Sequence, residues 1–158
     1  MAGDISVVQG EREAYWMGNG FIDIKLGADR TGGAFTLIEI VNLPGGGIGP
    51  HVHARDDETV MQVVGTLSGV IDGVDHVLHP GDVAFVPRGI VHSFLNNSSD
   101  TTRTFAITSP GGAESLVRET GIPKHGDTPP ALDPAAVDWA AIAASAAKVG
   151  FTFLPEGS

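Results

Sequence analysis

The sequence has no cysteine among its 158 residues. Disulfide bonds and thiolate metal ligands are therefore excluded, and nothing in the composition points to an oxidising compartment. Basic residues are also scarce, because nine Lys and Arg residues stand against nineteen Asp and Glu residues, for a formal net charge of −10. A chain of this charge repels the phosphate backbone that dominates nucleic-acid affinity, so we expect no nucleic-acid partner.

The N-terminal region lacks a long apolar run. Its first twenty residues include Asp4, Glu11, Arg12 and Glu13, whereas a secretion signal or a membrane anchor needs an uninterrupted apolar stretch. We therefore expect no membrane partner, and we expect the protein to be cytoplasmic.

Glycine, in contrast, is abundant, with 22 residues beside 10 prolines. Both residue types mark turns, and the short β-branched and aromatic runs between them predict an all-β sandwich or barrel with antiparallel neighbours. The length suits a single domain over residues 1–158. The predicted strands lie at residues 14–17, 21–26, 34–42, 59–64, 68–72, 77–79, 83–86, 92–96 and 103–108.

The succession of strand-like runs ends at Pro110. The residues that follow predict a helical extension over residues 111–150, approximately. Its predicted segments are a short helix over 112–120, an irregular connection over 122–132, an alanine-rich helix over 133–148 and an apolar closing segment over 151–154. Gly121 stands at the C-cap of the first helix. Asp133 is a suitable N-cap for the second helix, and Gly150 can end it.

His51 and His53 are the most informative pair in the sequence. Residues two apart on a strand project from the same face, so the two imidazoles would converge as metal ligands do. The pair alone is equally typical of a solvent-facing strand. Glu58 can join them only if a turn intervenes over residues 54–57, and His92 follows a turn-like segment at the start of another strand. Such a set would leave two cis positions of an octahedral shell for substrate, water or dioxygen.

The spacing of these residues resembles the two sequence motifs of the cupin superfamily, and ten fixed positions agree. The first motif reads Gly45, five residues, His51, one, His53, four, Glu58, six, Gly65; the second reads Gly81, five, Pro87, one, Gly89, two, His92, three, Asn96. The motif core therefore covers residues 45–96.

The resemblance implies a double-stranded β-helix, a jelly-roll-like barrel, with short C-terminal helices. It also implies that His51, His53, Glu58 and His92 hold one divalent transition-metal ion inside the barrel. Histidine and carboxylate ligands accept Fe, Mn, Ni, Co, Cu or Zn, so the identity of the ion stays open. Cupins commonly form dimers, so the resemblance implies a homodimer.

Three further segments are similar to those of small bacterial quercetinase-like cupins, at residues 15–16, 32–37 and 110–112. In such relatives the ligand glutamate is also the catalytic base, a role that the resemblance implies for Glu58. It therefore implies a metal-dependent dioxygenase that takes dioxygen and a flavonol-like, enol or phenolic small molecule. Two alternatives stay open: a non-redox metal-dependent isomerase or cyclase of secondary metabolism, and a small-molecule-binding cupin without turnover.

Strand parity adds three candidate substrate contacts. Gln62 and Val60 share the parity of Glu58, and Phe94 shares that of His92, so all three should point into the barrel. Each has a plainer alternative, which is a hydrogen bond to backbone or buried water for Gln62 and core packing for the apolar pair.

The remaining histidines and acidic neighbours match no motif position. We expect His76, His79 and His125 to be solvated or hydrogen-bonded at the surface. Asp56 and Asp57 precede Glu58 in an acidic triplet, and only Glu58 has the spacing of the motif. We therefore expect Asp56 and Asp57 to be solvated turn carboxylates.

Overall fold

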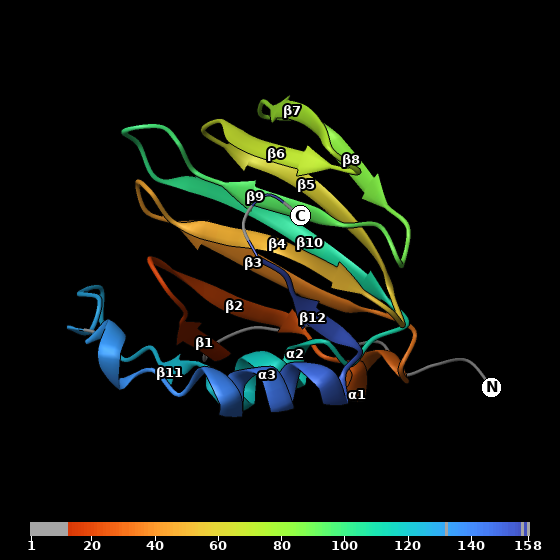
Figure 1. Ribbon diagram of the computed structural model, residues 1–158, viewed down its shortest axis with the longest axis vertical. Helices are drawn as coiled ribbons and strands as arrows, with labels where there is room; N and C mark the ends of the chain where they lie inside the picture. The colour runs from red at the N-terminus through yellow and green to blue at the C-terminus, as the bar shows by residue number, and fades with distance from the viewer. Residues whose placement is uncertain (1–12, 132, 156, 158) are drawn as a thin grey trace.

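The computed structural model describes residues 13–131, 133–155 and 157, and it has two facing β-sheets (Figure 1). Every strand pair within these ranges is antiparallel, as predicted. The larger sheet has the order β11-β1-β2-β3-β10-β5-β8, and the smaller has the order β12-β4-β9-β6-β7. The all-β prediction is confirmed.

The strands of the larger sheet are β1 (Glu13–Trp16), β2 (Gly20–Leu26), β3 (Thr36–Asn42), β5 (Asp57–Val64), β8 (Val83–Val86), β10 (Thr102–Ser109) and β11 (Ile122–Pro123). Those of the smaller sheet are β4 (Gly47–His53), β6 (Leu67–Ile71), β7 (Val74–Leu78), β9 (His92–Leu95) and β12 (Phe151–Phe153). Each of the nine predicted strands therefore overlaps an observed one. The two-residue β11 lies in the stretch predicted as irregular, and β12 lies in the predicted closing segment.

The core lies between the two sheets, because each strand turns alternate side chains inward. Strand β10 shows this best, since the inward Thr104 and Ala106 are buried while Arg103 and Ile107 are exposed. The inward residues of both sheets form one apolar cluster: Val60, Leu67, Leu78, Val86, Phe94 and Ala106.

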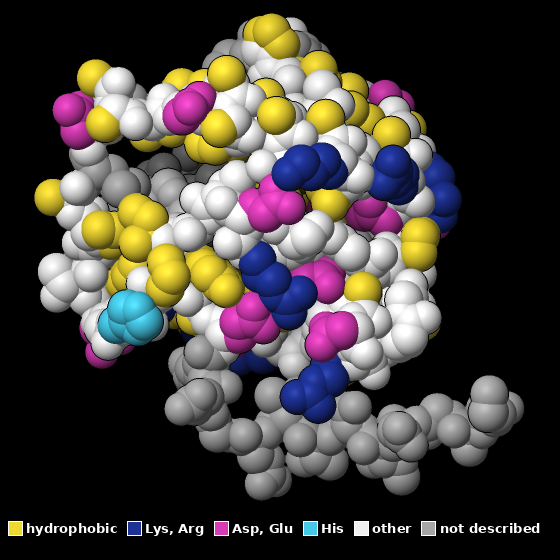
Figure 2. Space-filling model, turned by 90° about the horizontal axis from the view of Figure 1, so that it is seen from below, with side chains coloured by type: hydrophobic (Ala, Val, Ile, Leu, Met, Phe, Trp, Pro, Cys, Tyr) yellow, Lys and Arg dark blue, Asp and Glu magenta, His cyan; other side chains and the backbone are white. Residues whose placement is uncertain are grey.

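The helices cover one end of the sheets (Figure 1). They are α1 (Ala28–Thr31), which falls between the strands predicted at 21–26 and 34–42, α2 (Glu114–Thr120), the 3-10 helix η1 (Pro134–Ala136) and α3 (Trp139–Lys148). No helix in the described ranges has the length and apolar character to cross a membrane. Figure 2 looks onto this end and shows basic side chains beside acidic ones. One ion pair joins α2 to β1, where Nε of Arg118 lies 2.6 Å from a carboxylate oxygen of Glu13.

The continuous helix predicted over residues 133–148 is wrong, because two aspartates each start a separate helix. The Asp133 side chain accepts a hydrogen bond from the backbone N–H of Ala135, which begins η1. The Asp138 side chain accepts from the N–H of Ala141 and begins α3. An aspartate that satisfies free N–H groups favours a helix start over a helix interior. Gly150 follows the end of α3 with a φ of +77°, as a terminating glycine should.

Buried Glu114 joins α2 to the larger sheet. One carboxylate oxygen accepts a hydrogen bond from the N–H of Ala28 at 2.7 Å, and the other bonds the Thr36 hydroxyl. Burial would raise the pKa of Glu114, but these hydrogen bonds and the nearby Arg118 charge outweigh burial and lower it. The ionised carboxylate therefore fixes the start of α2 against α1 and β3.

Gly121 occupies the predicted C-cap of α2, but its backbone is extended, with φ −77° and ψ 154°. Its lack of a side chain matters for another reason. A Cβ atom added there would lie 2.6 Å from Tyr15 Cβ and 2.7 Å from the Val117 carbonyl oxygen. Glycine is therefore required by the close approach of β1 to the end of α2.

Gly121→Ala should consequently destabilise the fold. Because the added methyl group collides with backbone and with a Cβ atom, we expect the free energy of unfolding to fall by about 1–3 kcal/mol. Gly126→Ala is the matched control, since a Cβ there meets no atom within 4 Å. Chemical denaturation of both variants checks this, and equal stabilities would contradict the steric explanation.

Candidate metal centre

Four side chains meet inside the barrel: His51, His53, Glu58 and His92. All four are buried, and one potential ligand atom of each lies within 4.8 Å of the others. The imidazole rings of His51 and His92 have centroids 4.0 Å apart, and that of His53 lies within 5.4 Å of both. The structure therefore brings together the complete predicted ligand set.

Strand geometry explains this convergence. His51 and His53 lie two residues apart on β4 and share its inner face, and His51 is the direct antiparallel partner of His92 on β9. Between β4 and β5 the chain turns over residues 54–56, so that β5 begins one residue before Glu58. The turn reverses the parity that a continuous strand would impose, as predicted.

Backbone carbonyl groups orient two of the imidazoles. The Nδ1 atom of His51 lies 2.9 Å from the Gly49 oxygen, and that of His92 lies 2.9 Å from the Ile90 oxygen. A carbonyl oxygen only accepts, so each Nδ1 carries the hydrogen and donates it. Each ring therefore directs Nε2 into the cluster, and once this atom carries no proton its lone pair is available to a metal.

Asp56 orients the third imidazole. Its Oδ2 atom lies 2.7 Å from Nδ1 of His53, and both side chains are buried. The expectation that Asp56 is a solvated turn carboxylate is wrong, because the tight turn folds it back onto the histidine three residues earlier. Its neighbour Asp57 instead pairs with exposed Arg88, with Nη2 and Oδ2 3.0 Å apart.

The residues fit a divalent cation. The Nε2 atom of His53 is buried and has no hydrogen-bond partner among the described residues. A buried polar atom without a partner is costly, and an ion held by the cluster would take its lone pair. Beside it, Nε2 of His92 lies 3.0 Å from Oε2 of Glu58. Three imidazole nitrogens and one carboxylate oxygen suit transition metals, and they do not single out one element.

The electrostatics of the cluster also suit a cation. Burial, followed by repulsion from His92, lowers the pKa of His51 to about 3. Burial would raise the pKa of Glu58, but the hydrogen bond from His92 and the neighbouring imidazole charges lower it. Burial would lower the pKa of His53, yet the hydrogen bond to Asp56 and the charges of Glu58 and Asp56 raise it. Near neutral pH the centre thus holds an ionised carboxylate and a neutral His51.

The three predicted substrate contacts are buried inside the barrel. Val60 and Phe94 belong to the core cluster, and the rings of Phe94 and His92 meet edge-on at 5.8 Å. The Gln62 amide nitrogen donates to the carbonyl oxygens of Val64 and Gly65 at 2.7 and 3.0 Å. Its amide oxygen accepts from the Thr104 hydroxyl at 2.6 Å. These local bonds correspond to the plainer alternative for Gln62, and its contact with substrate stays a prediction.

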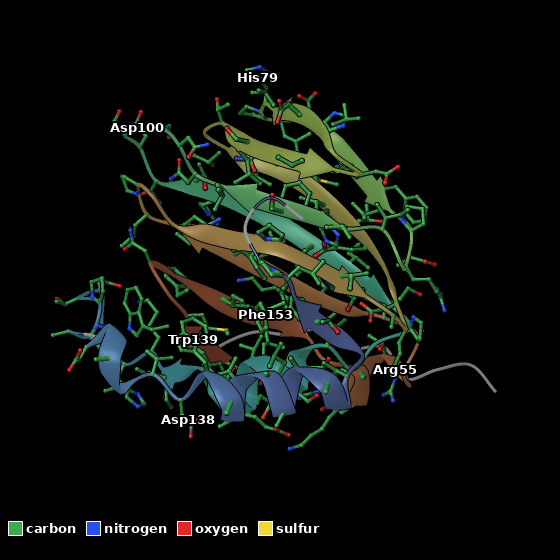
Figure 3. All side chains as sticks on the ribbon, viewed as in Figure 1. Arg55, His79, Asp100, Asp138, Trp139 and Phe153 are labelled. Atoms are coloured by element: carbon green, nitrogen blue, oxygen red, sulfur yellow. The ribbon has the colours of Figure 1, made fainter. Side chains whose placement is uncertain are left out.

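The other histidines lie outside the centre. His76, His79 and His125 are exposed, and Figure 3 shows His79 at the end of the sheets opposite the helices. This confirms the expected surface positions.

Phe151 is the neighbour of the metal centre that the sequence did not reveal. It lies on β12, which pairs with β4 so that Phe151 is opposite His53 and Phe153 is opposite His51. The pairing of a three-residue strand across about 100 positions leaves no local signal. The sequence signal at this position is limited to Phe151 following Gly150, the glycine predicted to end the helix.

Comparison with known proteins identifies the family. The Cupin domain family matches residues 39–108, a range that contains all four clustered side chains. The quercetin 2,3-dioxygenase of Bacillus subtilis is 30% identical over 122 residues, which cover 77% of this chain and 36% of the relative. The germin-like protein 5-1 of Oryza sativa is 33% identical over 95 residues, covering 56% of this chain and 40% of the relative. The chain thus spans little more than a third of the length of these curated relatives.

Solved structures agree on the fold. An RmlC-like cupin from Shewanella frigidimarina has a TM-score of 0.59 at 21% identity, over 70% of this chain and 96% of the other. The polyketide cyclase RemF from Streptomyces resistomycificus has a TM-score of 0.58 at 20% identity, over 67% of this chain and 79% of the other. The family match and the relative from Bacillus subtilis, together with the two-sheet barrel, show that the chain belongs to the cupin superfamily.

Asp56→Ala should weaken metal binding. Loss of the acceptor for Nδ1 frees the His53 ring, and loss of such a partner typically reduces metal affinity about 10–100-fold. Asp57→Ala is the control, because that neighbouring carboxylate pairs with Arg88 outside the cluster. Calorimetric titration of the metal-free proteins with zinc checks both, and equal affinities would remove Asp56 from the centre.

Metal affinity should also fall as the pH is lowered. Since Asp56 and Glu58 raise the pKa of His53, a metal ion must displace a proton from this ring below that pKa. His51, with a pKa of about 3, adds no such dependence near neutrality. Zinc titrations between about pH 5 and 8 should show the decline. In Asp56→Ala the decline should move to lower pH, and an unmoved profile would contradict the assignment.

Proposed function

We propose that this protein is a metal-dependent cupin dioxygenase that acts on a flavonol-like, enol or phenolic small molecule. The observation that carries the proposal is the buried convergence of three imidazoles and one carboxylate, in which Nε2 of His53 has no hydrogen-bond partner within the part of the chain that the structure describes. We further propose a single cupin domain over residues 1–158 that acts as a cytoplasmic homodimer.

A redox-capable ion held by His51, His53, Glu58 and His92 would supply Lewis acidity toward an enol oxygen and redox chemistry toward dioxygen. The chain itself supplies the base. Glu58 is ionised, because its pKa is held low by the hydrogen bond from His92 and the imidazole charges despite burial. A carboxylate within hydrogen-bond reach of a substrate hydroxyl can take its proton and later return it. Glu58 therefore removes the enol or phenol proton as the substrate oxygen binds.

The barrel wall suits a substrate with an aromatic body. The barrel interior contains an apolar group of side chains that includes Val60, Phe94 and, packed against the core cluster, Ile48 and Ile90. Apolar walls bury the carbon skeleton, while a few polar groups fix its orientation. We propose that Val60 and Phe94 contact the substrate, and that Gln62 does so if it exchanges one of its local hydrogen bonds.

The similarity to the Bacillus subtilis quercetin 2,3-dioxygenase supports the choice of reaction. It covers 77% of this chain, including the cluster and the strands that carry it. The name of that relative specifies a flavonol and dioxygen, which are the substrates proposed here.

Metal-loaded protein should consume dioxygen in the presence of quercetin. Purified protein is freed of metal with a chelator, loaded separately with nickel, iron, manganese, cobalt or zinc, and assayed with an oxygen electrode. Uptake should need both flavonol and a redox-capable ion. If turnover continues without dioxygen and with zinc, the protein is an isomerase or cyclase; if quercetin binds and is recovered unchanged, it is a binding protein.

Glu58→Gln should lower the rate of oxygen uptake about 10²–10⁴-fold, because the amide cannot accept the substrate proton. The metal content of the variant must be measured alongside, since Glu58 is also a ligand candidate. Asp57→Asn, one residue away and outside the cluster, should retain activity. A fully active, fully metallated Glu58→Gln protein would remove the base from the mechanism.

A further inference from the structure

Phe151 lies directly against two imidazoles of the metal centre. Its ring is stacked on that of His51, with centroids 4.7 Å apart and 13° between the planes. The same ring meets His53 edge-on, with centroids 4.9 Å apart. Phe151 is 8% exposed, and a phenyl ring has no donor atom for a metal. Its influence on the centre must therefore act through the histidines.

We propose that Phe151 is a positioning residue of the metal centre, which holds the ring planes of His51 and His53 in the orientation that metal binding needs. This inference rests on the metal binding of the proposed function and is independent of its oxygen chemistry. The hydrogen bond from Nδ1 of His51 to the Gly49 oxygen fixes the direction of one ring atom. A stacked neighbour fixes the plane as well, and the two constraints together leave one ring orientation.

Phe151 is itself held firmly from two sides. On one side β12 pairs with β4, and the next backbone contact, from the N–H of Leu154 to the Pro50 oxygen at 2.8 Å, extends this pairing. On the other side the ring packs against Leu116 of α2 and Ala146 of α3, which are buried with it in one apolar cluster. The ring is thus clamped between the helices and the strand that carries the histidines.

The same C-terminal segment also holds the turn that leads from His53 to Glu58. The backbone N–H of Ala54 donates to the Gly150 oxygen at 2.7 Å. The Arg55 guanidinium donates to the Lys148 oxygen at 2.7 Å, and Figure 3 shows Arg55 close to the end of α3. A Cβ atom on Gly150 would lie 2.7 Å from Arg55 Cγ. The end of α3 and β12 therefore contact β4, which carries His51 and His53, and the turn that leads to Glu58.

If Phe151 had a packing role alone, the effect of its substitution would differ from the effect expected for a positioning residue. If Phe151 only filled space, its loss would lower the free energy of unfolding and leave the bound metal unchanged. If it positions the ligands, its loss also alters the coordination of the metal. A spectroscopic measurement on folded protein separates these two roles.

The experiment compares Phe151→Leu, Phe151→Tyr and Phe153→Leu, each loaded with cobalt and without substrate. Phe153 is the matched control, because it lies two residues along β12, is 38% exposed and contacts Phe151, while no ring contact joins it to an imidazole in the described ranges. Phe151→Leu should bind cobalt about threefold to tenfold more weakly, as expected for the loss of one aromatic pair. Its visible absorption should shift, whereas Phe151→Tyr and Phe153→Leu should keep the wild-type affinity and spectrum.

A folded Phe151→Leu protein with wild-type affinity and spectrum would overturn the proposal, as would equal losses in Phe153→Leu. Should Phe151→Leu fail to fold by circular dichroism, Phe151→Met supplies a flexible, unbranched side chain that adapts to the space without a ring, and the same outcomes apply to it. Because no dioxygen or flavonol is present, the result stands or fails separately from the oxygenase assay.

Discussion

Three buried imidazoles present their metal-binding nitrogens to one carboxylate because their other nitrogens are hydrogen-bonded outside the cluster. The acceptors are the oxygens of Gly49 and Ile90 and the carboxylate of Asp56. Without these three bonds the rings could turn their Nδ1–H groups inward, and a cation would meet donors instead of lone pairs. The local backbone around each ligand is therefore as necessary to the centre as the ligands are.

Much of this centre could be predicted from sequence because it depends on short-range geometry. The parity of a strand places His51 beside His53, and a turn of suitable length brings Glu58 round to them. The ten motif positions then add His92, which no local pattern links to the others. Nine of the twelve strands in the described ranges could be predicted for the same reason, since alternation and turn residues are local features and β10 obeys them along its whole length.

Other features of the fold and of the centre depend on contacts that a single sequence does not reveal. Phe151 reads as an apolar residue of a closing segment, and its place against His51 follows from a strand pairing with β4. The alanine-rich stretch after Asp133 has the sequence of one continuous helix. That a second helix starts at Asp138 follows from the hydrogen bond that its side chain accepts from the N–H of Ala141, which the sequence alone does not show. The position of Asp56 could not be predicted, because an acidic turn is usually solvated and only the tightness of this turn buries it against His53.

The arrangement also bears on how this cupin could select a substrate. The hydrogen bonds of Gln62 are taken up by Val64, Gly65 and Thr104, so contact with a ligand would cost one of them. The apolar wall discriminates by size and shape, which is a weak filter, whereas loss of a required polar contact is a strong one. We infer that selection falls mainly on the substrate oxygen that meets Glu58 and the metal. A ligand without an ionisable hydroxyl has no proton to give to Glu58, so it would lose the polar contact that fixes its oxygen at the centre.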